Sequence, residues 1–479
     1  MHKTEAEHYW AGVFRRRRNA IRHQAGDGVI LWLGQVPQPR NYEGNAFPFR
    51  QDSHFLYYTG LPVPNLALLT YPETDRDVLF APPGDIDAVI WSGPGPSREE
   101  LARTAGIGAV EGPEGLEPRL AAARSRGGKI RYLPPYRASA VYRLCGLLGQ
   151  TPEEVAAGVS RPLMEAVAAE RSVKSGEEID QIEQALELTG RMHRACMAAA
   201  RPGVRERELA GLIQAIALSE GRQQAFAPIV TVHGEVLHNT SCDGILEEGR
   251  LLLNDSGAES PMHYASDITR TFPVSGRYSG LQADMYRLVI EVQREAIARI
   301  RPGATNREVH ARACRVLAEG LRGMGLMKGD AGEASAAGAH ALFFPHGIGH
   351  MMGLDVHDME DLGDIVGYRD KEPRSSQFGL QYLRLSRPLE PGFVLTVEPG
   401  VYFIPGLIDR WKSERRHEAF IDYGTVDRLR GFGGIRIEDN VVVTREGARI
   451  LGPAIPRTIP EVEEACARPL AGGWPPSLS

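Results

Sequence analysis

The sequence predicts an α/β protein of two domains, a mixed-sheet domain at the N-terminus followed by a duplicated α+β domain. Three observations lead to this prediction. Short apolar runs alternate with helical patterns and turn residues through residues 1–150. A helix–turn–helix joint containing Arg-Pro-Gly occurs twice, at Arg201 and at Arg301. The length of 479 residues suits two domains better than one.

The N-terminal region carries the pattern of a mixed or parallel sheet with helices beside it. Buried strands are expected at Val29–Leu33, Asn65–Tyr71 and Asp77–Ala81. Helical patterns follow at Arg98–Arg103 and Pro118–Arg124. The aromatic-rich stretch Phe47–Gly60 fits either an edge of the core or a rim that touches ligand.

The charge of the chain argues against nucleic acid or an anionic membrane as a partner. The net charge is −6 and the pI is near 6.2. The basic run Arg15–Arg18 lies in a helix-like stretch, and we expect it to form a solvated helix face rather than a site for a polyanion.

The five cysteines are scattered, odd in number and without CxxC spacing, which argues against a disulfide framework or a zinc ribbon. The N-terminus lacks the apolar core of a signal peptide, and the chain contains no run of 18 apolar residues. We therefore expect a soluble cytoplasmic protein.

The middle of the chain is helical from Pro152 to Met197 and contains the predicted domain boundary. Ser175 followed by Glu178 reads as the capped start of an amphipathic helix. We place the boundary near Ser160–Arg171, which gives domains of residues 1–165 and 166–479. Residues 471–479, rich in proline and glycine, are expected to be disordered.

The repeated joint predicts an internal duplication. A long helix precedes each Arg-Pro-Gly and another follows it, at Leu209–Glu220 and at Val309–Leu321. An apolar strand and paired strands bearing carboxylates come after each copy. Two such halves facing each other would form a curved sheet with a cleft at the pseudo-two-fold axis.

Four carboxylates lie in apolar, strand-like segments, an expensive place for a charge without a cation or metal. Leu251–Asn254 leads to Asp255, and a hairpin turn around Ser260–Tyr264 returns the chain to Asp267. In the second half the same arrangement carries Glu398 and Glu438.

The segment His346–Asp358 adds three histidines among glycines and short apolar residues, at His346, His350 and His357. Four carboxylates and one histidine, His350, suggest a pair of metal ions bridged by carboxylates. Oxygen-rich coordination of this kind suits manganese or another hard-to-borderline divalent ion. Two ions about 3.5–4 Å apart would stabilise the tetrahedral stage of acyl transfer.

The remaining histidines, His238, His346 and His357, are candidates to donate hydrogen bonds to substrate or to a developing oxyanion. Arg436, two residues before Glu438, is expected to orient that carboxylate. Other catalytic motifs fail: the chain has no HExxH helix, no Walker A loop and no GxSxG elbow.

These residues resemble the pita-bread metallopeptidases that include methionine aminopeptidase, aminopeptidase P and prolidase. The order of Asp255, Asp267, His350, Glu398 and Glu438 matches the family's ligands, and the phrases around them are close to those of aminopeptidase P and prolidase. The stretch from Phe47 to Phe55 is similar to the N-terminal domain that these two share.

The resemblance implies two divalent metal ions per chain, Mn²⁺ first and Co²⁺ or Zn²⁺ as alternatives. Those five residues would be the ligands, with Asp267 and Glu438 bridging, and Glu398 would also take the proton of the bridging water. It places His238, His346 and His357 around the Xaa-Pro bond and Tyr402 beside Glu398. Relatives are often dimers or tetramers, so we expect a homodimer or homotetramer.

Within the family, an insertion favours the prolidase branch. The stretch Asp361–Leu389 resembles an insertion of eukaryotic-type prolidase, in which Arg384 aligns with an arginine that holds a dipeptide's free carboxylate. The first expectation is therefore an Xaa-Pro dipeptidase, and the alternative is aminopeptidase P acting on longer Xaa-Pro-Xaa peptides. A metal-free or non-catalytic relative is a third hypothesis, disfavoured because all five ligands are present.

Overall fold

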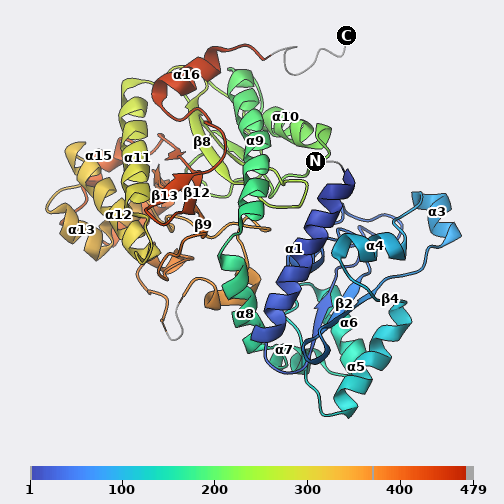
Figure 1. The fold of residues 1–479 in the computed structure, drawn as a ribbon. Helices are drawn as coiled ribbons and strands as arrows, with labels where there is room; N and C mark the ends of the chain where they lie inside the picture. The colour runs from blue at the N-terminus through green and yellow to red at the C-terminus, as the bar shows by residue number, and fades with distance from the viewer. Residues whose placement is uncertain (1–2, 369–371, 471–479) are drawn as a thin grey trace, which may run out of the picture. The chain divides into compact units, whose positions relative to one another are not determined.

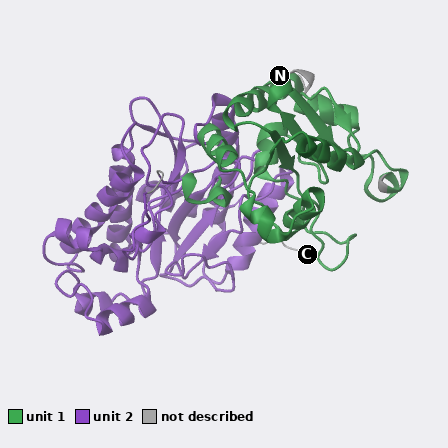
Figure 2. Cartoon of the chain, turned by 90° about the horizontal axis from the view of Figure 1, so that it is seen from below, with its two compact units in different colours: residues 1–171, 359–366 green, residues 172–358, 367–479 purple. Residues whose placement is uncertain are grey.

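The computed structural model describes residues 3–368 and 372–470 and divides into two compact units (Figure 2). Unit 1 contains residues up to 171 together with 359–366, and unit 2 contains residues 172–358 and those from 367 onward. The predicted boundary at residue 165 falls inside helix α8 (Arg161–Ser172), whereas unit 1 keeps this helix almost whole. The roles assigned to the two domains stay predictions.

Unit 1 is built on a mixed five-stranded sheet of order β4-β3-β2-β1-β5. The central strands pair antiparallel, and the edge strands β4 and β5 run parallel to their neighbours. The three predicted strands are present as β1, β2 and β3. The strands are β1 (Val29–Leu33), β2 (Ala67–Tyr71), β3 (Arg76–Phe80), β4 (Val110–Glu111) and β5 (Ile130–Arg131).

Helices flank this sheet and bury its apolar faces (Figure 1). One cluster packs Leu31, Leu69 and Phe80 of the sheet against Leu120 and Leu144 of two helices. Both helices predicted here are present, as α4 and α5. The helices of unit 1 are α1 (Lys3–Gln24), α2 (Ser53–Thr59), α3 (Ile86–Ser92), α4 (Arg98–Ala105), α5 (Leu116–Ser125), α6 (Ala138–Leu148), α7 (Pro152–Ala157) and α8.

The basic run of α1 is not the solvated face that the sequence predicts. Arg15 and Arg16 are exposed, but Arg17 and Arg18 are buried. Arg18 donates to Asp77 at 2.7 Å and to the Tyr58 carbonyl oxygen at 2.7 Å. The run straddles two faces of one helix, and a buried guanidinium is tolerated because it is paired.

The aromatic stretch before Gly60 resolves into a core element. Asp52 caps α2 by accepting from the backbone N–H of Phe55 at 2.9 Å, and every residue of this helix is buried. Of the two predictions for this stretch, an edge of the core or a rim that touches ligand, the first is correct for α2. Phe47, which precedes α2, is exposed.

Unit 2 contains the two halves that the repeated joint predicts. In the first half, helices α9 (Gly176–Ala199) and α10 (Glu206–Ser219) precede a sheet of order β6-β7-β8. In the second, α11 (Gly280–Arg299) and α12 (Asn306–Gly323) precede a sheet of order β13-β12-β9. The strands are β6 (Ile229–Thr231), β7 (Leu251–Ser256), β8 (Ile268–Pro273), β9 (Val394–Val397), β12 (Asp439–Val443) and β13 (Ala448–Ile450).

A separate antiparallel pair, β10 and β11, lies in the second half. It has no counterpart among the named strands of the first half within the described residues. The remaining elements are β10 (Gly400–Tyr402), β11 (Gly434–Arg436), α13 (Ala331–Ala337), α14 (Pro405–Ser413), α15 (Tyr423–Asp427) and α16 (Ile459–Ala467).

The two Arg-Pro-Gly joints have the same backbone structure. Gly203 and Gly303 both have positive φ, at 92° and 81°, which glycine adopts without steric cost. The N–H of Gly203 donates to the Leu246 carbonyl at 2.8 Å, and the N–H of Gly303 donates to the Leu389 carbonyl at 2.9 Å. This shared geometry supports a duplication rather than a chance similarity.

The halves meet through strands that also carry carboxylates. The backbone N–H of Glu438 donates to the Thr269 carbonyl at 3.0 Å. The Asn440 side chain bonds both backbone groups of Asp267, accepting from its N–H at 3.1 Å and donating to its carbonyl at 2.6 Å. Arg270 is buried and donates to the Glu438 carbonyl and the Asp439 carboxylate. The seam between the halves is therefore stabilised by hydrogen bonds at the carboxylates.

Within the described part of the chain, no helix is long and apolar enough to cross a membrane. All five cysteines are free thiols, in keeping with the expectation of no disulfide framework. The predicted disorder of residues 471–479 lies outside the described residues.

Candidate metal centre

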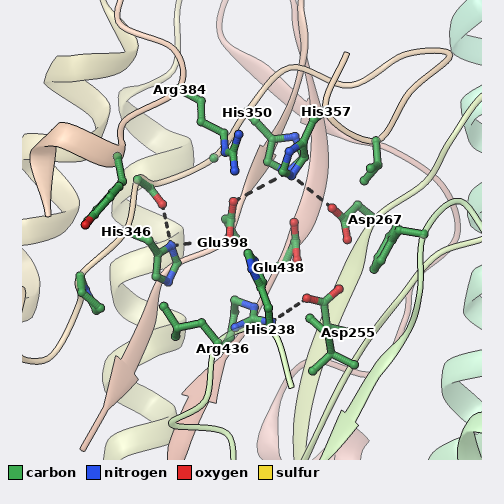
Figure 3. A pocket seen from close by; sticks show the side chains of 18 of the residues that line it. His238, Asp255, Asp267, His346, His350, His357, Arg384, Glu398, Arg436 and Glu438 are labelled. Carbon is green, nitrogen blue, oxygen red and sulfur yellow. Dashed lines mark hydrogen bonds and ion pairs between the residues drawn. The ribbon is translucent and has the colours of Figure 1, made fainter. Parts of the chain in front are cut away.

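Unit 2 contains a cavity of about 650 Å³ whose lining includes all five predicted metal ligands. Figure 3 shows the four carboxylates and His350 directed toward a common centre. The ligands come from both halves of the unit: Asp255, Asp267, His350, Glu398 and Glu438. The prediction that these side chains converge in space is confirmed by their positions, whereas their roles as ligands stay a proposal.

Strand ends position the carboxylates. Asp255 is the penultimate residue of β7, and Asp267 comes directly before β8. Glu398 follows β9, and Glu438 lies between β11 and β12. Because strands from the two sheets meet at the seam, residues distant in sequence become neighbours.

His350 lies between Asp267 of the first half and Glu398 of the second. Its Nε2 lies 3.5 Å from Asp267 Oδ2 and 3.8 Å from Glu398 Oε1. Donor atoms of Asp267, His350 and Glu438 all lie within 4.8 Å of one another. Its Nδ1–H donates to the Met351 carbonyl at 3.1 Å, which leaves the Nε2 lone pair facing the centre.

The electrostatics of the site favour a cation. Burial raises the pKa of Asp267 well above its ordinary value, and the neighbouring charge of Asp255 raises it further. Burial and the charge of Asp267 likewise raise the pKa of Glu438. Burial raises the pKa of Glu398 to about 7. Like charges held together away from water need a compensating positive charge.

Among the buried side-chain atoms of the five proposed ligands, two carboxylate oxygens have no hydrogen-bond partner in the described structure. Asp255 Oδ1 and Asp267 Oδ1 are both buried and unbonded. A buried carboxylate oxygen without a partner is costly, and a hard divalent cation would satisfy it. The donor set of carboxylate oxygens and one imidazole therefore fits a pair of divalent metal ions.

Arg436 acts on a different carboxylate from the one predicted. Its guanidinium donates to Asp255 Oδ2 at 2.6 Å and to Thr269 Oγ1 at 3.1 Å. Glu438 is held instead by the Thr269 hydroxyl, which donates to its Oε2 at 2.6 Å. Arg436 and Glu438 line the same cavity, as strand alternation predicts, but their hydrogen-bond connection runs through Thr269.

A hydrogen-bonded chain fixes His346 beside Glu398. Arg436 donates to the Tyr402 oxygen at 3.1 Å, and the Tyr402 hydroxyl donates to His346 Nε2 at 2.8 Å. His346 Nδ1 lies 2.9 Å from the Gly347 carbonyl and 3.7 Å from Glu398 Oε2. Burial lowers the pKa of His346 to about 3, so the ring is neutral and its proton stays on Nδ1.

His238, His357 and Arg384 line the same cavity. The His357 ring lies 4.1 Å from that of His350, centroid to centroid. Burial and the charge of Arg436 lower the pKa of His238, with a smaller contribution from Arg384. The structure therefore brings every predicted site residue to one cavity or, for Tyr402, into contact with its lining.

Several site residues escaped the sequence analysis. Thr269 holds Glu438, and Thr396 Oγ1 accepts from the His350 N–H at 3.1 Å. Threonine alternating with apolar residues in a strand gives no signal of a polar role. Apolar lining residues were also missed, although Phe378 and Tyr382 lie in the insertion that contains Arg384: Phe226, Leu237, Val356, Phe378 and Tyr382.

Comparison with known proteins places this site in a family. A sequence model of metallopeptidase family M24 matches residues 180–445, and one of the aminopeptidase P N-terminal domain matches residues 14–130. The chain belongs to family M24. The prediction of a pita-bread metallopeptidase of the aminopeptidase P and prolidase branch is confirmed at this level.

The similar proteins cover nearly the whole chain. A probable Xaa-Pro aminopeptidase PEPP of Ajellomyces capsulatus is 34% identical over 92% of each chain. The aminopeptidase PepP of Pseudomonas aeruginosa has a TM-score of 0.79 and 29% identity over 95% of this chain and 98% of its own. An aminopeptidase P variant of Escherichia coli in complex with substrate has a TM-score of 0.77, with 30% identity over the same shares. These names favour the aminopeptidase P alternative over the dipeptidase expectation.

Proposed function

We propose that this protein is a dinuclear metal-dependent aminopeptidase of the aminopeptidase P type, which releases the N-terminal residue of peptides with proline in second position. The observation that carries this proposal is the convergence of four buried carboxylates and one oriented imidazole in a single cavity. The names of relatives that share nearly the whole chain support the Xaa-Pro specificity.

The residues that would hold two divalent metal ions in this proposal are Asp255, Asp267, His350, Glu398 and Glu438. Oxygen donors with a single imidazole favour Mn²⁺, and Co²⁺ or Zn²⁺ would also fit. When bound, the ions supply Lewis-acid polarisation of the scissile carbonyl and an acidified water.

The chain's own residues handle protons and orient the peptide. Glu398 lies 3.7 Å from His346 Nδ1 and faces the cavity, so it is placed to accept a proton from an attacking water. His238 and His357 line the same space and can donate hydrogen bonds to the peptide carbonyl. Tyr402 positions His346 from behind.

A second candidate function, an Xaa-Pro dipeptidase, is favoured by one observation. Arg384 lines the cavity together with the aromatic side chains of Phe378 and Tyr382. A guanidinium in this place would bind the free carboxylate that a dipeptide presents directly after its proline. A longer peptide has an amide there and gains nothing from the charge.

Matched substrates decide between these candidates. We expect the manganese-loaded enzyme to cleave an Xaa-Pro-Xaa tripeptide with higher kcat/KM than the Xaa-Pro dipeptide of the same N-terminal residue. Arg384→Ala should then leave the ratio of the two kcat/KM values unchanged. A dipeptide preference that Arg384→Ala abolishes, with a loss of about 10-fold or more on the dipeptide alone, would overturn the first proposal in favour of the second. Arg387→Ala serves as the control, since Arg387 pairs with Glu390 and is absent from the lining.

We further propose a cytoplasmic location and a homodimer or homotetramer. Free cysteines support a reducing compartment. Fractionation of the native host and light scattering of the purified chain test these two points.

A further inference from the structure

A second cluster of metal-ligating side chains lies in unit 2, apart from the lining of the cavity. His310 and Cys314 belong to α12, and His340 belongs to a 3-10 helix at Ala339–Leu342. One donor atom from each residue lies within 4.8 Å of the other two. The side chains are buried, with exposed fractions between 2% and 5%. A spacing of four residues puts His310 and Cys314 on one face of the helix.

The polar atoms of this cluster are largely unsatisfied. His310 Nε2 lies 3.3 Å from Cys314 Sγ. His310 Nδ1 has no hydrogen-bond partner in the described structure, and neither nitrogen of His340 makes a hydrogen bond of normal geometry, although a weaker interaction with the Ser335 backbone opposes the fall in the His340 pKa. Imidazole nitrogens without good hydrogen bonds are costly in an apolar interior, where nearly all buried polar groups are bonded. Packing alone does not explain the cluster.

We propose that His310, Cys314 and His340 form an additional metal site for a thiophilic divalent ion of the Zn²⁺ class. One sulfur and two imidazole nitrogens are the donors that select such ions, in contrast to the oxygen donors of the cavity. Three protein ligands leave one tetrahedral position for water. On binding, the Cys314 thiol loses its proton to solvent and the thiolate forms the sulfur–metal bond.

Local structure holds the three ligands in place. Gly338 ends α13 with a φ of 85°, a conformation suited to glycine, and this turn brings His340 back toward α12. Burial lowers the pKa of His310 to about 3 and that of His340 to about 4, so both rings are neutral and keep a lone pair. The site is preformed rather than assembled from flexible segments.

The cluster lies one aromatic ring away from the candidate active site. Phe344 has its ring centroid 5.6 Å from that of His310 and 4.6 Å from that of His346. An ion bound at the cluster would therefore be separated from His346 by the ring of Phe344, which packs against both histidines. The proposal concerns metal binding and does not depend on the peptidase function.

Cobalt absorption tests the site directly, because a cysteine ligand gives a sulfur-to-cobalt charge-transfer band and the cavity lining contains no sulfur. We expect this band to develop when the full-length chain is titrated with Co²⁺ under reducing conditions. The band should stop growing when one Co²⁺ per chain is bound at the Cys314 site. Cys314→Ser should remove the band. Cys196→Ser, which alters an equally buried helical cysteine outside the cluster, should retain it. Absence of the band from the saturated wild-type chain, or its persistence in Cys314→Ser, overturns the proposal.

Two further measurements protect this test against a folding defect. The wild-type chain alone should lose the band when Zn²⁺ is added and keep it when Mn²⁺ is added in the same excess, since sulfur donors discriminate between the two. His340→Leu, checked by circular dichroism for native helix content, should weaken the Co²⁺ affinity read from the band by about 10-fold or more. Displacement by Mn²⁺ as effective as that by Zn²⁺, or an unchanged affinity in folded His340→Leu, contradicts the assignment.

Discussion

The two halves of unit 2 share a plan but divide the chemistry unequally. Each has a helix pair joined by Arg-Pro-Gly and a three-stranded sheet bearing two carboxylates of the candidate centre. The first half otherwise contributes His238, the hydroxyl of Thr269 and a mainly apolar lining. The second half contributes His350 together with the chain of Arg436, Tyr402 and His346.

The difference teaches where each property of the site arises. Metal binding needs donors from both sides of a cleft, and duplication of one sheet supplies them in pairs. Proton handling needs a hydrogen-bonded chain in one place, and the extra pair β10–β11 of the second half supplies its backbone. We therefore expect substitutions in either half to weaken metal binding equally. Substitutions that impair proton transfer should be found only in the second half.

The largest effect should follow loss of one carboxylate from either half. Asp267→Asn and Glu438→Gln should each lower kcat/KM by at least about 10²–10³-fold, because each removes a charge that holds the ions. Metal content per chain, measured by plasma emission spectrometry, should fall in both variants. Full metal content in one of the two would show that the halves do not share the ions.

Without metal, Asp267→Asn should not lower the stability of the chain. Burial and the charge of Asp255 raise the pKa of Asp267, so the metal-free chain bears the cost of its ionised form. Asp267→Asn removes that cost and should be at least as stable as the wild type when both are unfolded in chelator. A clearly lower stability in chelator would indicate a folding defect instead.

Tyr402→Phe should have an intermediate effect, confined to the chemical step. It breaks the bond from the Tyr402 hydroxyl to His346 Nε2 while leaving all five proposed ligands in place. We expect kcat to fall by about 10–10²-fold with unchanged metal content, because an orienting hydrogen bond is lost. A matching loss of metal would mean that Tyr402 supports the ions and not His346.

Much of this organisation could be predicted from the sequence, for identifiable reasons. Asp255 and Glu438 lie in apolar, strand-like stretches of sequence, so the high cost of a buried charge pointed to a cation. The repeated joints at Arg201 and Arg301 showed the duplication, because glycine is needed at the positive φ of both turns.

Other features needed coordinates. Arg436 and Glu438 are two residues apart, so strand alternation predicted a direct contact, but the guanidinium bonds Asp255, and Thr269 of the other half lies between it and Glu438. Arg17 and Arg18 read as surface charge because their partners, such as Asp77, are remote in sequence. His310 and His340 went unnoticed because nothing local in the sequence relates a position on α12 to a 3-10 helix thirty residues later.

A smaller effect should come from the hydroxyl that links the halves. Thr269→Val removes the bond to Glu438 Oε2 and the acceptor for Arg436 Nε. We expect kcat/KM to fall by about 10-fold and the affinity for Mn²⁺ to weaken similarly, as for other groups that orient a ligand. Thr271→Val is the matched control, since Thr271 is equally buried on β8 but bonds only the backbone of Arg436. Equal effects of the two changes would assign the loss to strand packing.

The smallest effect concerns stability without metal. Burial raises the pKa of Glu398 from 4.5 to about 7, and the charges of Asp267 and Asp255 add to this while His350 and Arg436 oppose it. The folded chain then binds more protons than the unfolded chain between these two pH values. This contribution to stability is complete below pH 4.5 and is lost as the pH rises through about 7.

Glu398→Gln should therefore flatten the fall in unfolding free energy over that pH range in chelator, by on the order of 1 kcal/mol. Denaturant unfolding of both chains across the range measures it. With metal restored, the wild-type dependence should reverse, because the ions bind the ionised carboxylates and their affinity grows with pH. If the unfolding free energy of the wild type depends on pH in the same way with and without metal, Glu398 does not contact the ions. Glu398 could then not be the residue that links metal binding to proton transfer in the second half.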